Sequence, residues 1–144
     1  MTVAELMPQI TQVPVPGGKM EDNYGEKVRI GLIALCDDLA VDRDFARMVP
    51  DDRVALIISR IFLEQPNSKR TFLEMAERIP ETVKLLCPLL RLDSIVFGCT
   101  TATSYIGESR VAELVHSARP GVNVTNPGSG AIAALKAVGA KRFP

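Results

Sequence analysis

The sequence has no tryptophan, a single histidine and no excess of charge of either sign. Lysine and arginine together number 17, as do aspartate and glutamate, and aromatic residues make up only 5% of the chain. A neutral chain of mixed charges has no long-range attraction to nucleic acid or to an anionic membrane. Few aromatic side chains also leave little for nucleic-acid bases to stack on. These scarcities predict that neither nucleic acid nor a membrane is a partner.

The sequence also lacks recognisable signals for export or membrane insertion. Its first residues show no charged stretch followed by an apolar one, and no apolar run approaches the roughly 18 residues of a membrane-spanning helix. Three cysteines, an odd number, are typical of reduced thiols rather than of a disulfide framework. We therefore predict a cytoplasmic protein. His116 has no partner at metal-ligand spacing, so no metal site is expected.

What the chain does contain is enough apolar sequence for one ordinary domain. It has 144 residues, of which 47% are apolar. Residues 1–26 are interpreted as an extended leader, because prolines and a Gly-Gly pair interrupt any helix there. Residues 27–144 are interpreted as an α/β half-domain. Residues 140–144 follow the end of the last helix and resemble residues 26–29, which lead into the first strand. They are therefore interpreted as the start of a further strand, which predicts that the chain is truncated before a second half.

Strands and helices alternate along residues 27–144. Strands are predicted at Val28–Leu35, Val54–Ile58, Ser94–Gly98 and Val122–Val124, each rich in apolar residues, as strands buried on both faces are. Helical spacing of apolar residues follows each strand, with Ser68 as an N-cap, Pro80 as a break and Gly139 after the last helix. This alternation predicts a flavodoxin-like parallel sheet with helices on both faces, in the strand order 2-1-3-4.

Chemically active side chains follow the predicted strands, where the carboxyl ends of a parallel sheet form one edge. Cys99, Thr100 and Thr101 follow the third strand, before an amphipathic helix predicted to open at residues 107–109, while Asp37 and Arg60 follow the first and second strands. Arg60 could bind a carboxylate in bidentate fashion, and Thr100 and Thr101 could hold its second oxygen or a developing enolate. A thiol at a helix start favours the thiolate. We predict Cys99 as a nucleophile or proton-transfer group.

Each of these residues also has a purely structural interpretation. Cys99 could be an inert buried thiol in a turn, Thr100 and Thr101 could cap that turn, and Arg60 could be a solvated loop residue. Cys36 is more typical of a structural cysteine, and Cys87 is assigned to a helix as a core or semi-exposed residue. A third possibility is a phosphate or nucleotide site at Gly128–Gly130, although that segment lacks the complete phosphate-binding motifs.

Several segments resemble the aspartate/glutamate/hydantoin racemase superfamily. The similarity begins at Tyr24-Gly25, covers residues 24–144 and is strongest at Phe97–Gly107, the segment around Cys99. The branch of maleate cis-trans isomerases, arylmalonate decarboxylases and ectoine-utilisation proteins is the most similar. The ectoine-utilisation proteins are nearest, because they share the Arg43-Asp44-Phe45 and Ser59-Arg60 segments. Further similar segments are residues 29–35, 42–48, 118–122 and 133–139.

The resemblance implies one half of a pseudo-symmetric two-domain fold, with the active site between the halves. It implies a cofactor-independent isomerase, racemase or decarboxylase that acts on a small carboxylate. Cys99 matches the cysteine of the first half, and Thr100 and Thr101 match residues that hold a substrate carboxylate. Asp37 lies in a substrate-contacting loop but replaces the Asn or Pro of other branches. The second cysteine has no match at Cys36 or Cys87.

The unmatched second half leaves two functional hypotheses open. A second chain or a longer protein could complete an isomerase or racemase site. Alternatively, the chain is a non-catalytic domain that binds a carboxylate or an amino-acid derivative through Thr100, Thr101 and Arg60. Because a missing half exposes apolar surface, we also expect a homo-oligomer.

Overall fold

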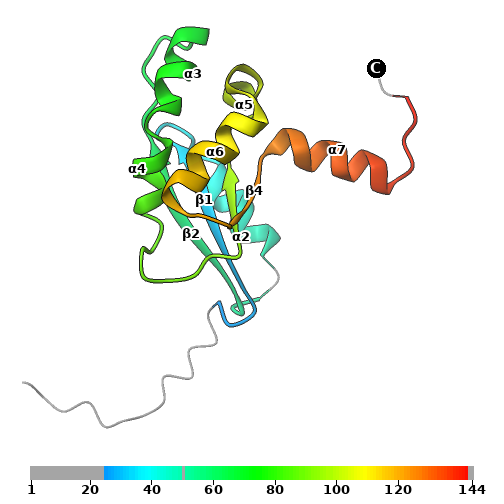
Figure 1. Cartoon of the computed structure of the whole chain (residues 1–144). Helices are drawn as coiled ribbons and strands as arrows, with labels where there is room; N and C mark the ends of the chain where they lie inside the picture. The colour runs from blue at the N-terminus through cyan, green and yellow to red at the C-terminus, as the bar shows by residue number, and fades with distance from the viewer. Residues whose placement is uncertain (1–24, 50, 143–144) are drawn as a thin grey trace, which may run out of the picture.

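A four-stranded parallel sheet forms the centre of the protein (Figure 1). The computed structural model describes residues 25–49 and 51–142, so the leader expected at residues 1–26 lies almost wholly outside the described residues. The strand order is β2-β1-β3-β4, as predicted, and every neighbouring pair is parallel. The strands are β1 (Val28–Leu35), β2 (Val54–Ile61), β3 (Ser94–Phe97) and β4 (Asn123–Thr125).

Most of the helices cover one face of this sheet. Helix α4 packs against α6, α3 packs against α5, and α2 lies against β2 on the other face (Figure 1). Helices therefore lie on both faces, as the sequence predicted. The helices are α2 (Val41–Met48), α3 (Lys69–Ala76), α4 (Ile79–Lys84), α5 (Thr100–Ile106), α6 (Glu108–Ala118) and α7 (Pro127–Ala137).

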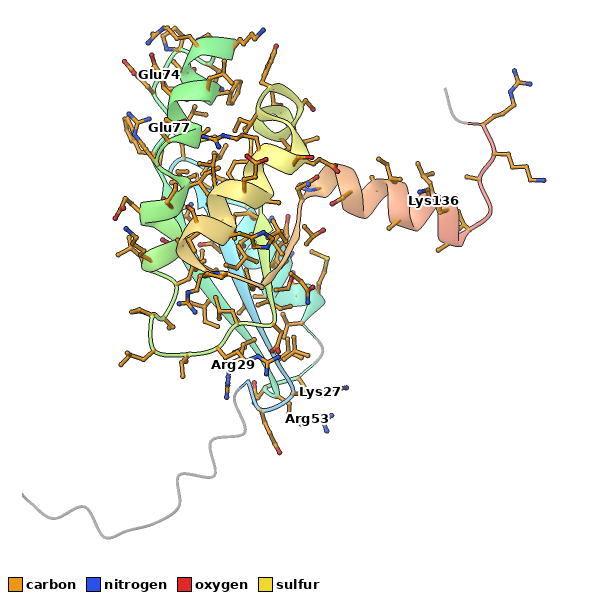
Figure 2. All side chains as sticks on the ribbon, in the orientation of Figure 1. Lys27, Arg29, Arg53, Glu74, Glu77 and Lys136 are labelled. Atoms are coloured by element: carbon orange, nitrogen blue, oxygen red, sulfur yellow. The ribbon has the colours of Figure 1, made fainter. Side chains whose placement is uncertain are left out.

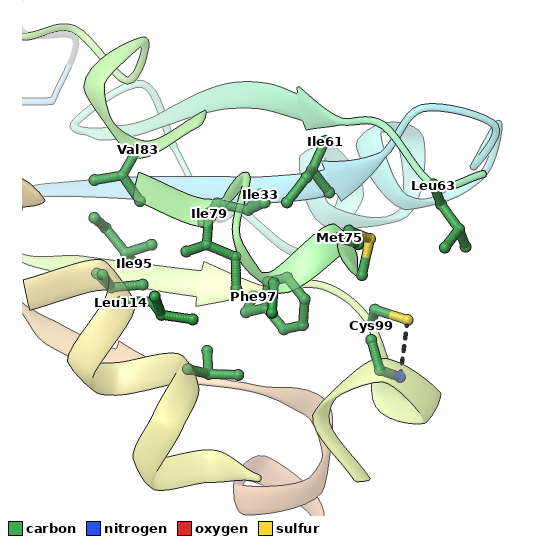
Figure 3. Packing of buried hydrophobic residues seen from close by; sticks show 14 of the residues in the cluster. Ile33, Ile61, Leu63, Met75, Ile79, Val83, Ile95, Phe97, Cys99 and Leu114 are labelled. Carbon is green, nitrogen blue, oxygen red and sulfur yellow. Dashed lines mark hydrogen bonds between the residues drawn. The ribbon is translucent and has the colours of Figure 1, made fainter. Parts of the chain in front are cut away.

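The core lies between the sheet and the helices α3 to α6 (Figure 3). Alternate strand residues, including Ile33, Ile61, Ile95 and Phe97, point into it because side chains alternate between the faces of a strand. These side chains are at most 1% exposed, and Met75, Ile79, Val83 and Leu114 of the helices pack against them. Cys99 belongs to the same cluster, so the core reaches the carboxyl edge of the sheet.

The opposite face of the sheet is less completely covered. Leu32 and Ala34 of β1 are fully buried, but Leu56, Ile58 and Val96 beside them are only half-buried. Helix α2 has no buried residue of its own among the described residues. The face covered by α3 to α6 therefore contributes most of the hydrophobic stabilisation, because burial of apolar surface is most complete there.

The structure corrects three details of the predicted elements. Residues 100–106, predicted as a turn rich in hydroxyl side chains, form helix α5. Strand β2 continues three residues beyond its predicted end, to Ile61. Cys87 lies after α4 rather than within a helix, and its φ of 43° is left-handed. The predicted Ser68 N-cap is confirmed by a capping box with Thr71, and the helical region around Pro80 is divided into α3 and α4 as predicted.

Candidate functional site

Two predicted site segments meet at the carboxyl edge of the sheet, because β1 and β3 are parallel neighbours there. The amide of Gly98 donates to the carbonyl of Ile33 at 2.9 Å, and the amide of Cys36 donates to the carbonyl of Ile61 at 2.9 Å. These bonds hold Cys99 beside the loop Cys36–Asp38. A larger residue at position 98 would crowd this approach, since a Cβ there would lie 3.0 Å from the Ile33 carbonyl oxygen.

Cys99 is the N-cap of α5, and its thiol points back to the helix. Its Sγ accepts a hydrogen bond from the Ala102 amide at 3.4 Å (Figure 3). Its carbonyl accepts from the Thr103 amide at 3.1 Å and from the Thr103 hydroxyl at 2.7 Å. The residue is only 8% exposed. The thiol is therefore held in one orientation at the boundary between the core and the sheet edge.

Burial raises the pKa of the Cys99 thiol above its ordinary value. Hydrogen bonds from the amides of Ala102 and Thr101 lower the pKa, while the negative charges of Asp37 and Asp38 raise it further. The net direction is upward, so the thiol form is favoured. The prediction that the helix start would favour the thiolate is therefore wrong, because the desolvation of a charged sulfur outweighs two amide donors.

Thr100 and Thr101 begin α5 immediately after this thiol. Both residues are exposed, and the Thr100 carbonyl accepts a hydrogen bond from the Ser104 hydroxyl at 3.1 Å. Within the described part of the chain, no hydrogen bond occupies the hydroxyl of either threonine. The two hydroxyls are thus free of other partners at the sheet edge, and ligand binding by them stays a prediction.

The two aspartates of the 36–38 loop have different partners. Asp38 accepts hydrogen bonds from the amides of Ala40 and Val41 at 2.9 and 3.0 Å and so orders the start of α2. Asp37 is exposed, and its carboxylate accepts from the Gln65 side chain at 3.1 Å. Asp37 is therefore the carboxylate of this pair that remains accessible to a ligand, whereas Asp38 has a structural role.

Arg60 holds the 36–38 loop against the end of β2. Its Nη1 donates to the carbonyls of Leu35 at 2.7 Å and Asp38 at 2.8 Å, and its Nη2 donates to the Asp42 carboxylate at 2.5 Å. All three contacts are to the protein itself. Substrate binding by Arg60 stays a prediction. The contacts present in the structure indicate that Arg60 positions the loop that carries Asp37.

Two residues that belong to this arrangement were not singled out from the sequence. Thr103 holds the carbonyl of Cys99, and Asp42 neutralises Arg60. The position of Thr103, four residues after Cys99, would have indicated its role if α5 had been recognised as a helix. Asp42 had no such signal, because its contact with Arg60 depends on how the loop folds over β2.

The glycine-rich start of α7 offers little to a phosphate. Asn126 accepts a hydrogen bond from the Ser129 amide at 2.9 Å, and the Ser129 hydroxyl accepts from the Asn126 amide at 3.1 Å, so a capping box occupies these groups. A Cβ on Gly128 would lie 3.5 Å from a carboxylate oxygen of Glu108, whose charge repels an anion. This geometry disfavours the phosphate-binding hypothesis.

The other groups considered from the sequence lie away from Cys99. His116 shares a hydrogen bond of 2.8 Å between its Nε2 and the Val122 carbonyl. Residues 25–49 and 51–142 contain no group of three or more His, Cys, Asp or Glu side chains arranged to hold a metal ion. Among the same residues, no helix is both long and apolar enough to cross a membrane.

Removing the negative charge of Asp37 is expected to lower the pKa of Cys99, because that carboxylate disfavours the thiolate. The pH dependence of Cys99 alkylation by iodoacetamide, followed by peptide mass spectrometry, should shift to lower pH in Asp37→Asn. Asp52→Asn is the matched control, since Asp52 lies at the amino end of β2. An unchanged or higher midpoint in Asp37→Asn would show that Asp37 does not act on this thiol.

Comparison with solved structures identifies the fold as half of a larger enzyme fold. The maleate isomerase Iso from Pseudomonas putida has a TM-score of 0.61 and 16% identity over 78% of this chain and 50% of its own. Maleate cis-trans isomerase from Nocardia farcinica, bound to TRIS, has a TM-score of 0.61 and 18% identity over 78% of this chain and 49% of its own. The chain has the fold of a maleate isomerase half-domain.

A second structure of the Nocardia enzyme also matches the chain. A cysteine-to-serine variant of that enzyme carries a covalently bound succinylcysteine intermediate, and it matches at 17% identity with a TM-score of 0.61. This chain spans about half the length of each of these enzymes. No protein-family model and no curated protein sequence matched the chain.

Proposed function

We propose that this chain carries the cysteine half of a cofactor-independent isomerase or racemase site for small carboxylates. The observation that supports this proposal is the placement of Cys99 at the sheet edge, where the Ala102 amide orients its thiol. The hydroxyls of Thr100 and Thr101 lie next to it in the chain and have no hydrogen-bond partner in the described residues. Hydroxyl and amide donors suit a carboxylate or an enolate, and a thiol beside them can attack or take a proton. The half-domain fold shared with maleate isomerases supports the same chemistry.

The proposed reaction is addition of sulfur to a double bond conjugated with a carboxylate. Cys99 first loses its proton to solvent. Its sulfur then forms a bond to one alkene carbon, and the π electron pair moves to give an enolate held by Thr100 and Thr101. The former carbon–carbon double bond is now a single bond, and the adduct rotates about it. The enolate electrons then re-form the double bond in the other geometry as the carbon–sulfur bond breaks, which regenerates the thiolate. The succinylcysteine intermediate of the Nocardia enzyme supports addition over simple proton abstraction.

The raised pKa of Cys99 favours a second candidate function. A thiol that keeps its proton in this half is a poor nucleophile, so the chain by itself could be a binding domain for a carboxylate or an amino-acid derivative. In that case Thr100 and Thr101, together with Arg60, would bind the ligand without turnover. The isomerase candidate needs a reduced thiol at Cys99, and that proposal therefore includes a cytoplasmic location.

Turnover and binding should be measured on the same purified chain. NMR would follow incubation with maleate, with an arylmalonate and with ectoine-derived amino acids, which separates isomerisation, decarboxylation and ectoine-related chemistry. Isothermal titration calorimetry with the same compounds would detect binding without turnover. A new product supports the enzyme, and heat of binding without product supports the binding domain. No product and no binding with any of the three classes would contradict both.

A further inference from the structure

The loop Cys36–Asp38 is fastened by a single arginine on the neighbouring strand. Arg60 belongs to β2, which pairs with β1 along its whole length, so that Ala34 lies opposite Arg60. Its Nη1 donates to the carbonyl of Leu35 at 2.7 Å, just before the loop, and to the carbonyl of Asp38 at 2.8 Å, at the end of the loop. One guanidinium nitrogen therefore closes the loop against the sheet.

Asp42, in the first turn of α2, holds this arginine from the other side. Its Oδ2 accepts from Nη2 of Arg60 at 2.5 Å, and the two side chains are 40% and 36% exposed. The second carboxylate oxygen, Oδ1, is buried and has no hydrogen-bond partner among the described residues. A buried acceptor without a partner lowers stability, and an ion pair at this exposure adds little. What the pair does fix is the orientation of the guanidinium.

The loop that Arg60 closes carries two carboxylates that act on Cys99. Burial raises the pKa of this thiol, and among the charged groups of the described residues Asp37 and Asp38 raise it further. Asp38 also caps the start of α2, and Asp37 accepts from the Gln65 side chain at 3.1 Å. Movement of the loop would therefore change the distance between these charges and the thiol.

We propose that Arg60 and Asp42 are positioning residues for Cys99, which together fix the loop Cys36–Asp38 beside the thiol and so set its reactivity. Asp42 orients the guanidinium, the guanidinium closes the loop, and the loop places its carboxylates. Neither side chain needs to contact a substrate for this role. The importance of the thiol for turnover rests on the proposed function, whereas its reactivity toward an alkylating reagent does not.

Asp42→Asn tests this role, because it removes the charge that holds Arg60 and changes the shape of the side chain little. A loosened loop lets Asp37 and Asp38 move away from the thiol, and the loss of nearby negative charge lowers the pKa of Cys99. We expect the pH midpoint of Cys99 alkylation by iodoacetamide to fall by a few tenths of a pH unit, the scale for partly solvated charges. The urea midpoint of unfolding should change little, because the ion pair is exposed.

Arg60→Met separates positioning from a direct electrostatic effect. Loss of a positive charge alone would raise the alkylation midpoint, whereas loss of the loop closure should lower it, as in Asp42→Asn. The double variant should have the midpoint of Arg60→Met, since Asp42 acts only through Arg60. A raised midpoint in Arg60→Met, or additive shifts in the double variant, would overturn the proposal.

Two other pairs of aspartate and arginine provide matched controls. Asp44 pairs with Arg43 at 3.2 Å on the same helix, and Asp51 pairs with Arg53 at 2.7 Å just before β2. Figure 2 shows Arg53 at the end of the sheet where the strands begin, away from the carboxyl edge. Asp44→Asn and Asp51→Asn should leave the midpoint of Cys99 alkylation unchanged. An equal shift in either control would mean that the thiol responds to any loss of surface charge, and the positioning role would fail.

Turnover distinguishes failure of this role from failure of the proposed function. An unchanged alkylation midpoint in Arg60→Met, together with a higher KM for a small carboxylate, would assign Arg60 to ligand binding and overturn the positioning role. If the unaltered chain turns over no small carboxylate, the proposed function fails. The alkylation midpoints then still decide whether Arg60 and Asp42 set the reactivity of Cys99.

Discussion

Serine in place of Cys99 should lower turnover of a small carboxylate by about 10,000-fold or more, the scale for loss of a catalytic nucleophile. The serine hydroxyl can still accept the Ala102 amide, so the helix cap and the fold should persist. Its much higher pKa removes the thiolate that the proposed addition requires. NMR of maleate, under the conditions that give turnover with the unaltered protein, measures the loss.

Cys87→Ser is the matched control for this variant. Cys87 lies after α4, remote from the sheet edge, and its carbonyl accepts a hydrogen bond from Arg119 at 2.8 Å. The same chemical change there should leave turnover within about twofold, because surface changes away from special contacts are usually small. Equal losses in the two variants would point to a general effect of thiol removal. Full activity in Cys99→Ser would refute the role of Cys99.

The sheet order and the positions of most helices could be predicted from the sequence because apolar runs and helix signals are local. Helix α5 could not, since Thr100, Thr101 and Thr103 are β-branched residues with low helix propensity. Their helix is stabilised by tertiary packing instead. Phe72 of α3 stacks on Tyr105 of α5 with ring centroids 5.6 Å apart, and Ala102 is fully buried. Such contacts between distant segments override local preference.

The candidate site could likewise be predicted only where its features depend on local sequence. The placement of Cys99 at a strand end followed from the pattern around it, but the upward direction of its pKa depends on burial, which distant core residues decide. The contacts of Arg60 were also invisible in the sequence. Two of its acceptors are the backbone carbonyls of Leu35 and Asp38. Backbone atoms have no sequence signature, and only the pairing of β1 with β2 brings them to Arg60.

Truncation of Phe97 tests whether the core and the site form one unit. Phe97 is fully buried and lies two residues before Cys99 in the same cluster. Phe97→Ala should lower the free energy of unfolding by about 3–5 kcal/mol, through lost burial and the cavity that remains. Urea unfolding followed by circular dichroism, with the slope checked for two-state behaviour, measures this change. Because Cys99 is buried by the same cluster, its alkylation should also become faster.

Val96 is the matched control, because it precedes Phe97 and points to the opposite face of the sheet. That face is incompletely covered, and Val96 is only half-buried, so Val96→Ala should cost about 1 kcal/mol. Its effect on Cys99 alkylation should be small. Similar costs for the two variants would mean that the sheet is stabilised equally on both faces. A large loss in Phe97→Ala with unchanged Cys99 reactivity would instead show that the thiol is shielded by α5 and the loop Cys36–Asp38 alone.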